Sequence, residues 1–141
     1  RQLALIKAKA GFRTEMIPTR LQAYERLILF LERIEPNQMI PRVHHPTLNA
    51  AMFKQELQKA VRDEFEHNLT QQIYVSNDAW DKLVESRNAV NQLIELASKS
   101  VGDNATGIQL STVLFGILEK AGISPTAEAI ETLKAEAHQL L

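Results

Sequence analysis

Apolar residues recur every three or four positions along most of the chain, a spacing typical of helices that bury one face. No convincing strand pattern and no internal repeat of fixed period accompanies them. The pattern therefore predicts an all-α fold, a helical bundle of four to six helices. The predicted helices cover about residues 2–10, 18–34, 49–72, 76–100, 106–121 and 125–140.

Two of these helices, 49–72 and 76–100, are long, and the short β-prone link Ile73-Tyr74-Val75 separates them. We expect them to form a long antiparallel helical hairpin, because a short link leaves neighbouring helices side by side. Residues 35–48 contain three prolines spaced five residues apart. Proline disfavours helix in the residue before it, so this segment is predicted to be a proline-rich crossover loop. The loop is expected to be held on the surface by Met39, Ile40 and Val43.

Residues that cap helices mark several of the predicted boundaries. Ser76 fits an N-cap, and Thr106 with Gln109 fits the reciprocal capping box. Gly122 fits a C-cap, and Ser124-Pro125 fits the first residues of the last helix. These residues predict where the fourth, fifth and sixth helices begin and where the fifth ends.

Two further glycines and one proline affect the predicted helices. Gly11 is expected to end the first helix, and Pro18-Thr19 is expected to begin the second. Gly116 lies inside a predicted helix, where a glycine commonly marks close packing against a neighbouring helix.

Charge is distributed unevenly, although the total is only −1. Residues 1–20 contain five cations and one anion, a net +4, so residues 21–141 carry −5. We therefore divide the chain into a basic N-terminal arm, 1–17, and a single helical domain, 18–141. The arm is either a solvated segment or a juxtamembrane segment on the cytoplasmic side, where cations are in excess. Its cations are Arg1, Lys7, Lys9 and Arg13.

Composition excludes several other classes of protein. The longest apolar run, Leu27 to Leu31, is five residues long, against about 20 needed to cross a bilayer. Without cysteine there is no disulfide scaffold, no thiolate metal site and no cysteine nucleophile. The excess of cations in the arm is too small for more than weak, salt-sensitive contact with nucleic acid, so no specific nucleic-acid partner is expected. Because the chain begins at Arg1 rather than Met, we expect a segment upstream of it.

Motifs for catalysis and nucleotide binding are missing from the sequence. There is no Gly-rich phosphate loop, no Gly-x-Ser-x-Gly nucleophile elbow and no His-Glu-x-x-His zinc motif. We therefore expect a protein that is not an enzyme, needs no cofactor and has no identifiable small-molecule substrate.

Glu64 and His67 form a Glu-x-x-His pair, whose side chains share one face of a helix. Di-iron carboxylate bundles use two such pairs and two further glutamates, and this chain lacks the second pair. A homodimer would have to supply it. The other interpretation is an ordinary polar face on which Asp63 lies near His67. A metal- or small-ligand-binding bundle is thus the alternative to an interaction role.

Two segments are candidates for contact with a partner. The helix 20–34 is apolar around much of its circumference and is either a covered central helix or an exposed strip. In the second case its contact residues are Tyr24, Leu29 and Phe30. Residues 66–72 are rich in neutral hydrogen-bonding groups, which either satisfy a helix end or form a polar contact site. The candidates there are His67, Asn68, Gln71 and Gln72. Arg87 is expected to stack on an aromatic ring or to pair with an acid at the core edge.

Three segments carry a resemblance to a known family: residues 20–34, residues 64–76 and the pair Ala79-Trp80. In this order they resemble an uncharacterised family of small proteins from Bacteroidota. The resemblance covers about residues 17–100 well and the C-terminal forty residues poorly. It implies a membrane helix at the N-terminus, followed by a basic stretch and a cytoplasmic helical domain. It implies no activity and no catalytic residue.

Together these observations favour a non-enzymatic helical module that binds another protein or a second copy of itself. The basic arm and the resemblance place it on the cytoplasmic face of the inner membrane. A soluble cytoplasmic protein is the alternative.

Overall fold

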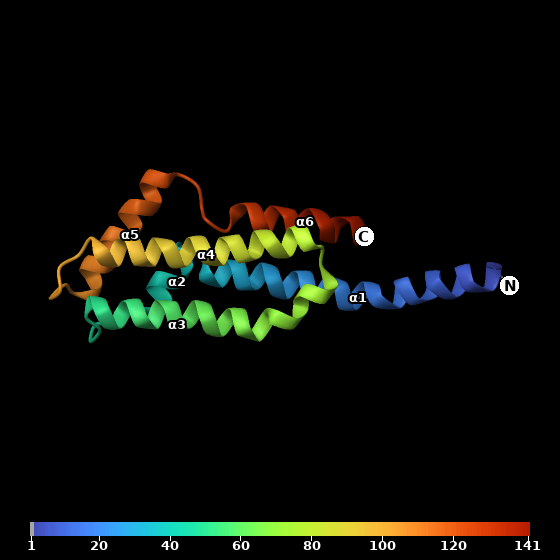
Figure 1. Cartoon of the computed structure of the whole chain (residues 1–141), viewed down its shortest axis with the longest axis horizontal. Coiled ribbons are helices and arrows are strands. Elements are labelled where there is room, and N and C mark those ends of the chain that lie inside the picture. Colours follow the sequence, from blue (N-terminus) through green and yellow to red (C-terminus); the bar gives the residue numbers. More distant parts are fainter. Residues whose placement is uncertain (1) are drawn as a thin grey trace.

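The computed structural model describes residues 2–141, and the side chains of all of these except residues 12 and 13. The described residues form six α-helices and one short 3-10 helix and contain no strand, so the predicted all-α bundle is confirmed (Figure 1). The helices are α1 (Gln2–Ile34), α2 (Pro36–Val43), α3 (Ala50–Asn68), η1 (Leu69–Tyr74), α4 (Asn77–Lys99), α5 (Gly107–Ala121) and α6 (Ala127–Leu140).

Four helices form an elongated bundle, and the two others lie near the end remote from the N-terminus (Figure 1). The second half of α1 packs against α6 and α3, while α4 packs against α3 and α6, so these four helices enclose a common core. α3 and α4 run in opposite directions and η1 joins them, which is the expected antiparallel hairpin. α2 and α5 pack against α3 beyond the end of α1.

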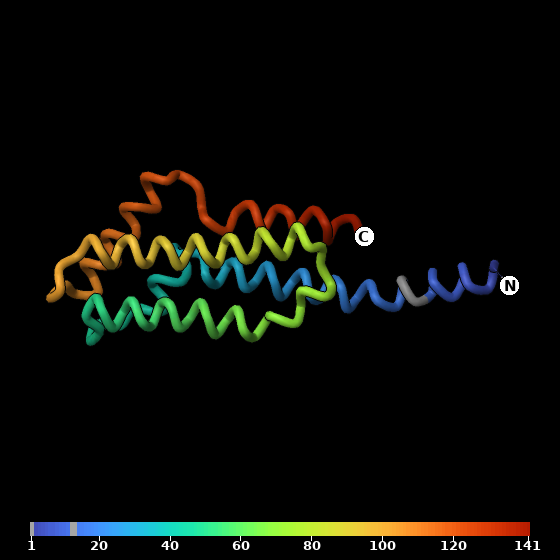
Figure 2. Tube along the Cα trace, in the orientation of Figure 1, coloured from blue at the N-terminus to red at the C-terminus, as the bar shows by residue number. Residues whose placement is uncertain are grey.

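α1 is one continuous helix, so the predicted end at Gly11 and new start at Pro18 are wrong. Proline inside a helix leaves the carbonyl four residues earlier, here that of Thr14, without its usual N–H donor. Thr14 and Pro18 are both exposed, so water can satisfy that carbonyl. The first half of α1 projects beyond the bundle (Figure 2), and partial burial begins at Met16. The arm therefore ends where packing begins, not where a helix ends.

The expected loop over residues 35–48 is also wrong, because residues 36–43 form α2. Pro36 occupies the first turn, where its missing N–H would have no partner in any case. The Glu35 side chain caps the helix by accepting a hydrogen bond from the Asn37 N–H at 2.8 Å. As expected, three apolar side chains hold this segment against the core: Met39 and Ile40 are buried, and Val43 is partly buried.

The link between the hairpin helices is a 3-10 helix rather than a β-prone segment, and α3 ends at Asn68 instead of residue 72. The Arg26 guanidinium of α1 donates to the carbonyl of His67 at 2.8 Å. A long-range donor thus satisfies one of the carbonyls that the end of α3 leaves free. This tertiary contact is invisible in the local pattern of residues 66–75.

The capping residues fit the structure at three of four helix ends. Ser76 caps α4, Thr106 and Gln109 form the capping box of α5, and Gly122 adopts the left-handed conformation after α5. The last helix differs from the prediction, because α6 begins at Ala127 instead of Pro125. Ser124 accepts instead from the Thr126 N–H at 3.3 Å within the turn that precedes α6.

The core is continuous along the bundle. The second half of α1 contributes one fully buried stripe, and each other α-helix contributes a shorter set of buried residues. Three aromatic rings meet in it: Phe65 lies 6.0 Å from Phe30 and 5.7 Å from Trp80, centroid to centroid. Such distances are typical of favourable aromatic pairs, so these rings fasten α1, α3 and α4 to one another.

Two chain segments cross closely where α3 and α5 begin. The Ala50 N–H donates to the Ala105 carbonyl at 3.0 Å, and Asn49 and Thr106 form an isolated antiparallel bridge. A Cβ atom on Gly107 would lie only 2.8 Å from the Leu48 carbonyl oxygen. Close packing is therefore found at Gly107 and not at Gly116, around which a Cβ atom would meet nothing within 4 Å.

This crossing predicts opposite effects for two glycine substitutions. Gly107→Ala is expected to lower the free energy of unfolding by about 1–3 kcal/mol, because the added methyl group overpacks the crossing. Gly116→Ala is the matched control and is expected to raise it by about 0.5–1 kcal/mol, because alanine favours an exposed helix interior. Urea unfolding followed by circular dichroism measures both. Equal changes in the two variants would contradict the crossing.

Candidate functional site

The polar residues 66–72 mostly satisfy the end of α3 and the start of η1. The Asn68 amide donates to the Glu64 carbonyl at 2.8 Å, and the Gln72 amide donates to the Leu69 carbonyl at 2.9 Å. The His67 Nδ1 atom lies 2.8 Å from the Asp63 carbonyl oxygen. Asn68 is buried, His67 and Gln72 are exposed, and Gln71 is half-buried. Of the two interpretations, these contacts favour structural satisfaction of the helix end.

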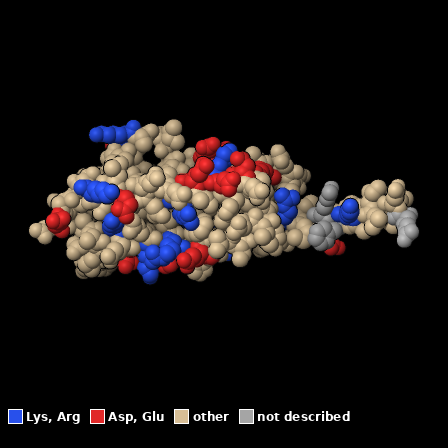
Figure 3. All heavy atoms as spheres, in the orientation of Figure 1, with Lys and Arg blue, Asp and Glu red and all other residues tan. Residues whose placement is uncertain are grey.

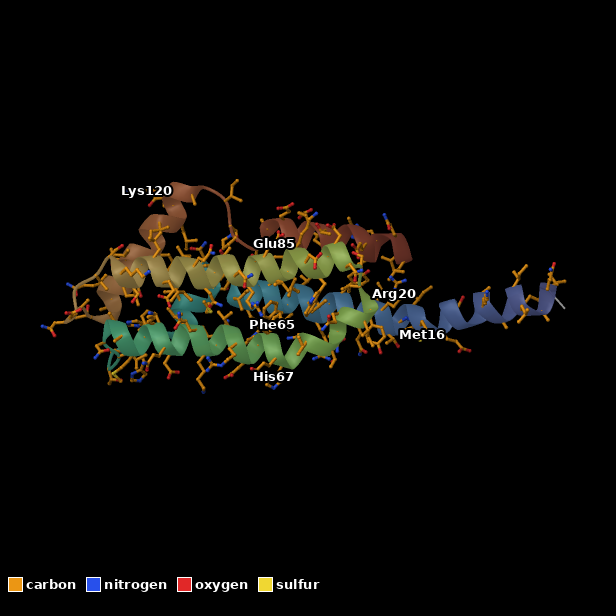
Figure 4. The ribbon with its side chains drawn as sticks, viewed as in Figure 1. Met16, Arg20, Phe65, His67, Glu85 and Lys120 are labelled. Atoms are coloured by element: carbon orange, nitrogen blue, oxygen red, sulfur yellow. The ribbon has the colours of Figure 1, made fainter. Side chains whose placement is uncertain are left out.

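Glu64 pairs with Arg33 of α1 instead of facing a second acidic ligand. His67 lies on the outer side of α3, whereas Phe65 lies on its inner side (Figure 4). Among residues 2–141 as described, no three His, Asp or Glu side chains gather closely enough to hold a metal ion. Glu64 is therefore part of an ion pair with Arg33, and His67 is part of the hydrogen-bonded end of α3.

The three apolar candidates on α1 separate into buried and exposed residues. Tyr24 and Phe30 belong to the core, with 2% and 1% of their surface exposed. Leu29 faces outward and is 58% exposed. The helix 20–34 is thus mainly a covered central helix, and Leu29 alone of these three is open to a partner.

The basic arm carries exposed apolar side chains as well as cations. Leu3 and Ile6 are each 63% exposed, and Lys7 and Lys9 are exposed beside them. Arg1 lies outside the described residues, and so does the side chain of Arg13. Of the helices that the structure describes, none has both the length and the apolarity needed to span a membrane.

A polar cluster holds α1 where it leaves the bundle, near the labelled Arg20 (Figure 4). The Tyr24 hydroxyl donates to Glu136 of α6 at 2.9 Å, and the Ser76 hydroxyl donates to the other oxygen of the same carboxylate. Arg20 donates from Nε to the Tyr74 carbonyl at 3.3 Å and from Nη2 to the Tyr24 hydroxyl at 3.5 Å. The cluster therefore joins α1, η1, α4 and α6.

Burial raises the pKa of Tyr24 above its ordinary value, and the hydrogen bond to the Glu136 carboxylate raises it further. Both effects oppose formation of a phenolate next to an existing negative charge. Tyr24 therefore stays protonated at neutral pH, and its hydroxyl donates to Glu136 to hold α1 against α6.

A groove of about 1000 Å³ lies between α3 and α4. Its apolar lining comes from Val61, Phe65, Leu69 and Leu96. Its polar lining includes Arg62, Glu66, Arg87, Asn88, Asn91, Gln92, Glu95 and Lys99. The Arg87 guanidinium lies 4.2 Å from the centroid of the Phe65 ring, so the predicted stacking on an aromatic side chain is confirmed.

Sequence reasoning missed this groove. No motif marks Arg62, and Leu96 is one of many apolar residues on its predicted helix. The one available signal was that Leu69 and Leu96 are apolar. Whether such residues are covered depends on where α1 and α6 pack, which the pattern of α3 and α4 does not show.

The comparison with family models decides the family of the chain. The model of the family of unknown function DUF7935 matches residues 1–140. The chain belongs to this family. The expectation that the chain belongs to an uncharacterised family is therefore confirmed. No curated protein and no solved structure matches the chain.

In this DUF7935 protein the Tyr24 cluster predicts how stability depends on pH. The unfolded tyrosine ionises near pH 10 and the folded one at higher pH, so the unfolded state loses its proton first. Stability is therefore expected to decline as the pH rises above about 10. Tyr24→Phe should flatten this decline, because it removes the ionising hydroxyl. Unfolding of both proteins measured between neutral and alkaline pH tests this, and an equally steep decline in Tyr24→Phe would contradict it.

Proposed function

We propose that this protein is a non-enzymatic protein-interaction module that is held at the cytoplasmic face of the inner membrane. One observation carries the proposal: the first half of α1 projects beyond the bundle with its apolar side chains uncovered. Leu3, Leu5 and Ile6 are 60–63% exposed, and no other described segment packs on them. Exposed apolar residues in this number favour a surface that another molecule covers.

Charge supports the membrane part of the proposal. Within the arm, Lys7 and Lys9 flank the exposed apolar side chains, and Glu15 is the single acid among residues 1–17. Cations close to the cytoplasmic surface of a membrane are attracted by its anionic lipids. The resemblance to Bacteroidota proteins with a membrane helix before a basic stretch supports the same placement, and we propose the same origin for this chain.

Fractionation of cells that express the full-length natural protein tests the membrane part. The protein is expected in the membrane fraction and should stay there after an alkaline carbonate wash, because an inserted helix resists extraction. External protease added to spheroplasts should leave residues 2–141 intact if they lie on the cytoplasmic side. Recovery of the protein in the soluble fraction would contradict the anchoring.

Proximity labelling tests the interaction part. The full-length protein fused to a labelling enzyme is expected to mark a reproducible neighbour, and Leu3→Gln/Ile6→Gln should reduce that labelling at least several-fold. The matched control Ala4→Gln/Ala8→Gln changes exposed residues on another face of the same helix and should retain it. A protein that is monomeric and marks no reproducible neighbour would contradict an interaction role.

A further inference from the structure

The groove between α3 and α4 contains apolar surface that the rest of the described chain leaves open. Val61, Phe65 and Leu69 follow one another at intervals of four residues, so they form one row along α3 and into η1. Val61 is fully buried and Phe65 is half-buried, so the open apolar surface of this row lies at Phe65 and Leu69. Leu96 lies across from this row on α4 and is 56% exposed, and Leu69 is 42% exposed. Every residue that lines the groove comes from α3, α4 or the first residue of η1.

Cations outnumber free carboxylates along this groove. Among the described residues, no carboxylate lies within 4.0 Å of the charged nitrogens of Arg62, Arg87 or Lys99. Glu95 is already compensated, since Lys54 pairs with it at 3.1 Å and Gln58 donates to it at 2.8 Å. The Gln58 hydrogen bond and the Lys54 contact, with the nearby charge of Lys99, hold the pKa of Glu95 below its ordinary value. Glu66 is the one remaining acid of the groove, so its local charge is positive.

The positive groove contrasts with the domain as a whole, whose net charge is −5 over residues 21–141. Acidic side chains gather instead over α6 and the adjoining part of α4, as Figure 3 shows. Asp78, Glu85 and Glu128 are among them, since all three act on Lys82, which pairs with Asp78 at 3.3 Å and with Glu128 at 3.8 Å. An anionic partner would therefore be repelled by that face and attracted to the groove, which gives one preferred orientation of binding.

We propose that the groove binds an amphipathic helix of a partner protein, with an apolar stripe on the groove floor and carboxylates toward Arg62, Arg87 and Lys99. This rests on the proposed interaction role, for which it names the chemistry of the partner. The groove runs from Gln58 to Leu69 along α3, which at about 1.5 Å per residue is about 16 Å, or three helical turns. That length accommodates apolar side chains at positions i, i+3 or i+4 and i+7.

A helix suits this groove better than an extended peptide. Both walls are helices, whose backbone groups already bond within each helix, so no strand edge is present to pair with an extended chain. A helical partner satisfies its own backbone and needs only side-chain contacts. The Asn91 Oδ1 atom is buried and has no hydrogen-bond partner among the described residues.

Charge also argues against the arm of a second copy as the occupant. The arm has exposed leucines, but Lys7 and Lys9 would bring further cations against Arg62 and Lys99. The proposed partner is therefore a different chain with acidic flanks.

Two designed peptides test the proposal with the purified chain. Both are 16-residue helices with leucines at i, i+4, i+7 and i+11, and they differ only in flanking Glu or Lys. Fluorescence anisotropy is expected to show the Glu peptide binding at least about tenfold more tightly than its Lys twin, with affinity that falls as salt rises. Amide chemical shifts should change in α3 and α4 around Phe65 and Leu96.

Charge reversal of the groove provides the matched variants. Arg62→Glu/Lys99→Glu is expected to weaken binding of the Glu peptide at least about tenfold. Lys9→Glu/Lys120→Glu makes the same change in charge at exposed sites away from the groove and should alter binding less than about twofold. Arg87 is left intact because it packs on Phe65, and circular dichroism confirms that both variants fold.

Three outcomes would overturn the proposal. These are equal affinity for the two peptides, no binding of the Glu peptide at millimolar concentration, and shift changes confined to other helices. A dimer in sedimentation that Arg62→Glu/Lys99→Glu dissociates would assign the groove to a second copy instead. If proximity labelling marks a neighbour that this double variant does not affect, the interaction role stands and the groove proposal fails.

Discussion

The fold depends on burying one stripe of α1 against three neighbouring helices. Ala23, Tyr24, Leu27, Phe30, Leu31 and Ile34 are almost completely buried, and they meet α3, α4 and α6. Removing apolar surface from water stabilises a folded protein by about 25 cal/mol per Å². Burial of this stripe therefore contributes strongly to the stability of a domain of this size. Every other long helix needs to bury only one face because α1 supplies the surface that they share. The aromatic contacts of Phe65 fix the positions of α3 and α4 against α1, and the hydrogen bonds to Glu136 fix the position of α6.

Local pattern predicted the helices wherever burial and capping act within one segment. The hairpin, the Ser76 cap and the capping box of α5 depend on neighbours within a few residues, and all of them fit the structure. Two of the wrong predictions involved prolines, whose cost depends on where they lie in a helix. Pro18 is tolerated because it and Thr14 are exposed, so water can satisfy the carbonyl that Pro18 leaves free, and Pro36 because it lies in a first turn. A single sequence shows where the proline is, but it does not show which face of the helix will be exposed to solvent.

The candidate site was less predictable than the fold. The polar residues at the end of α3 were identified correctly as unusual, but their hydrogen bonds are mostly internal, and Arg26 arrives from a different helix. The groove is formed by residues that look ordinary on each helix separately. Its character comes from Lys54 neutralising Glu95 while Arg62 and Lys99 stay unpaired, and this pairing exists only after α3 and α4 are placed side by side.

Because α1 is continuous through Pro18, the arm has a defined length and phase. Under the proposed anchoring, residues 2–16 at about 1.5 Å each place the bundle about 20 Å from the anchor. The same helix sets the direction in which the groove faces, because each residue turns it by about 100°. The number of residues in the arm therefore determines the position and direction of the groove as much as their identity does. Lengthening it by one residue would turn the groove away from its original direction, whereas lengthening it by a whole number of turns would only move the groove outward.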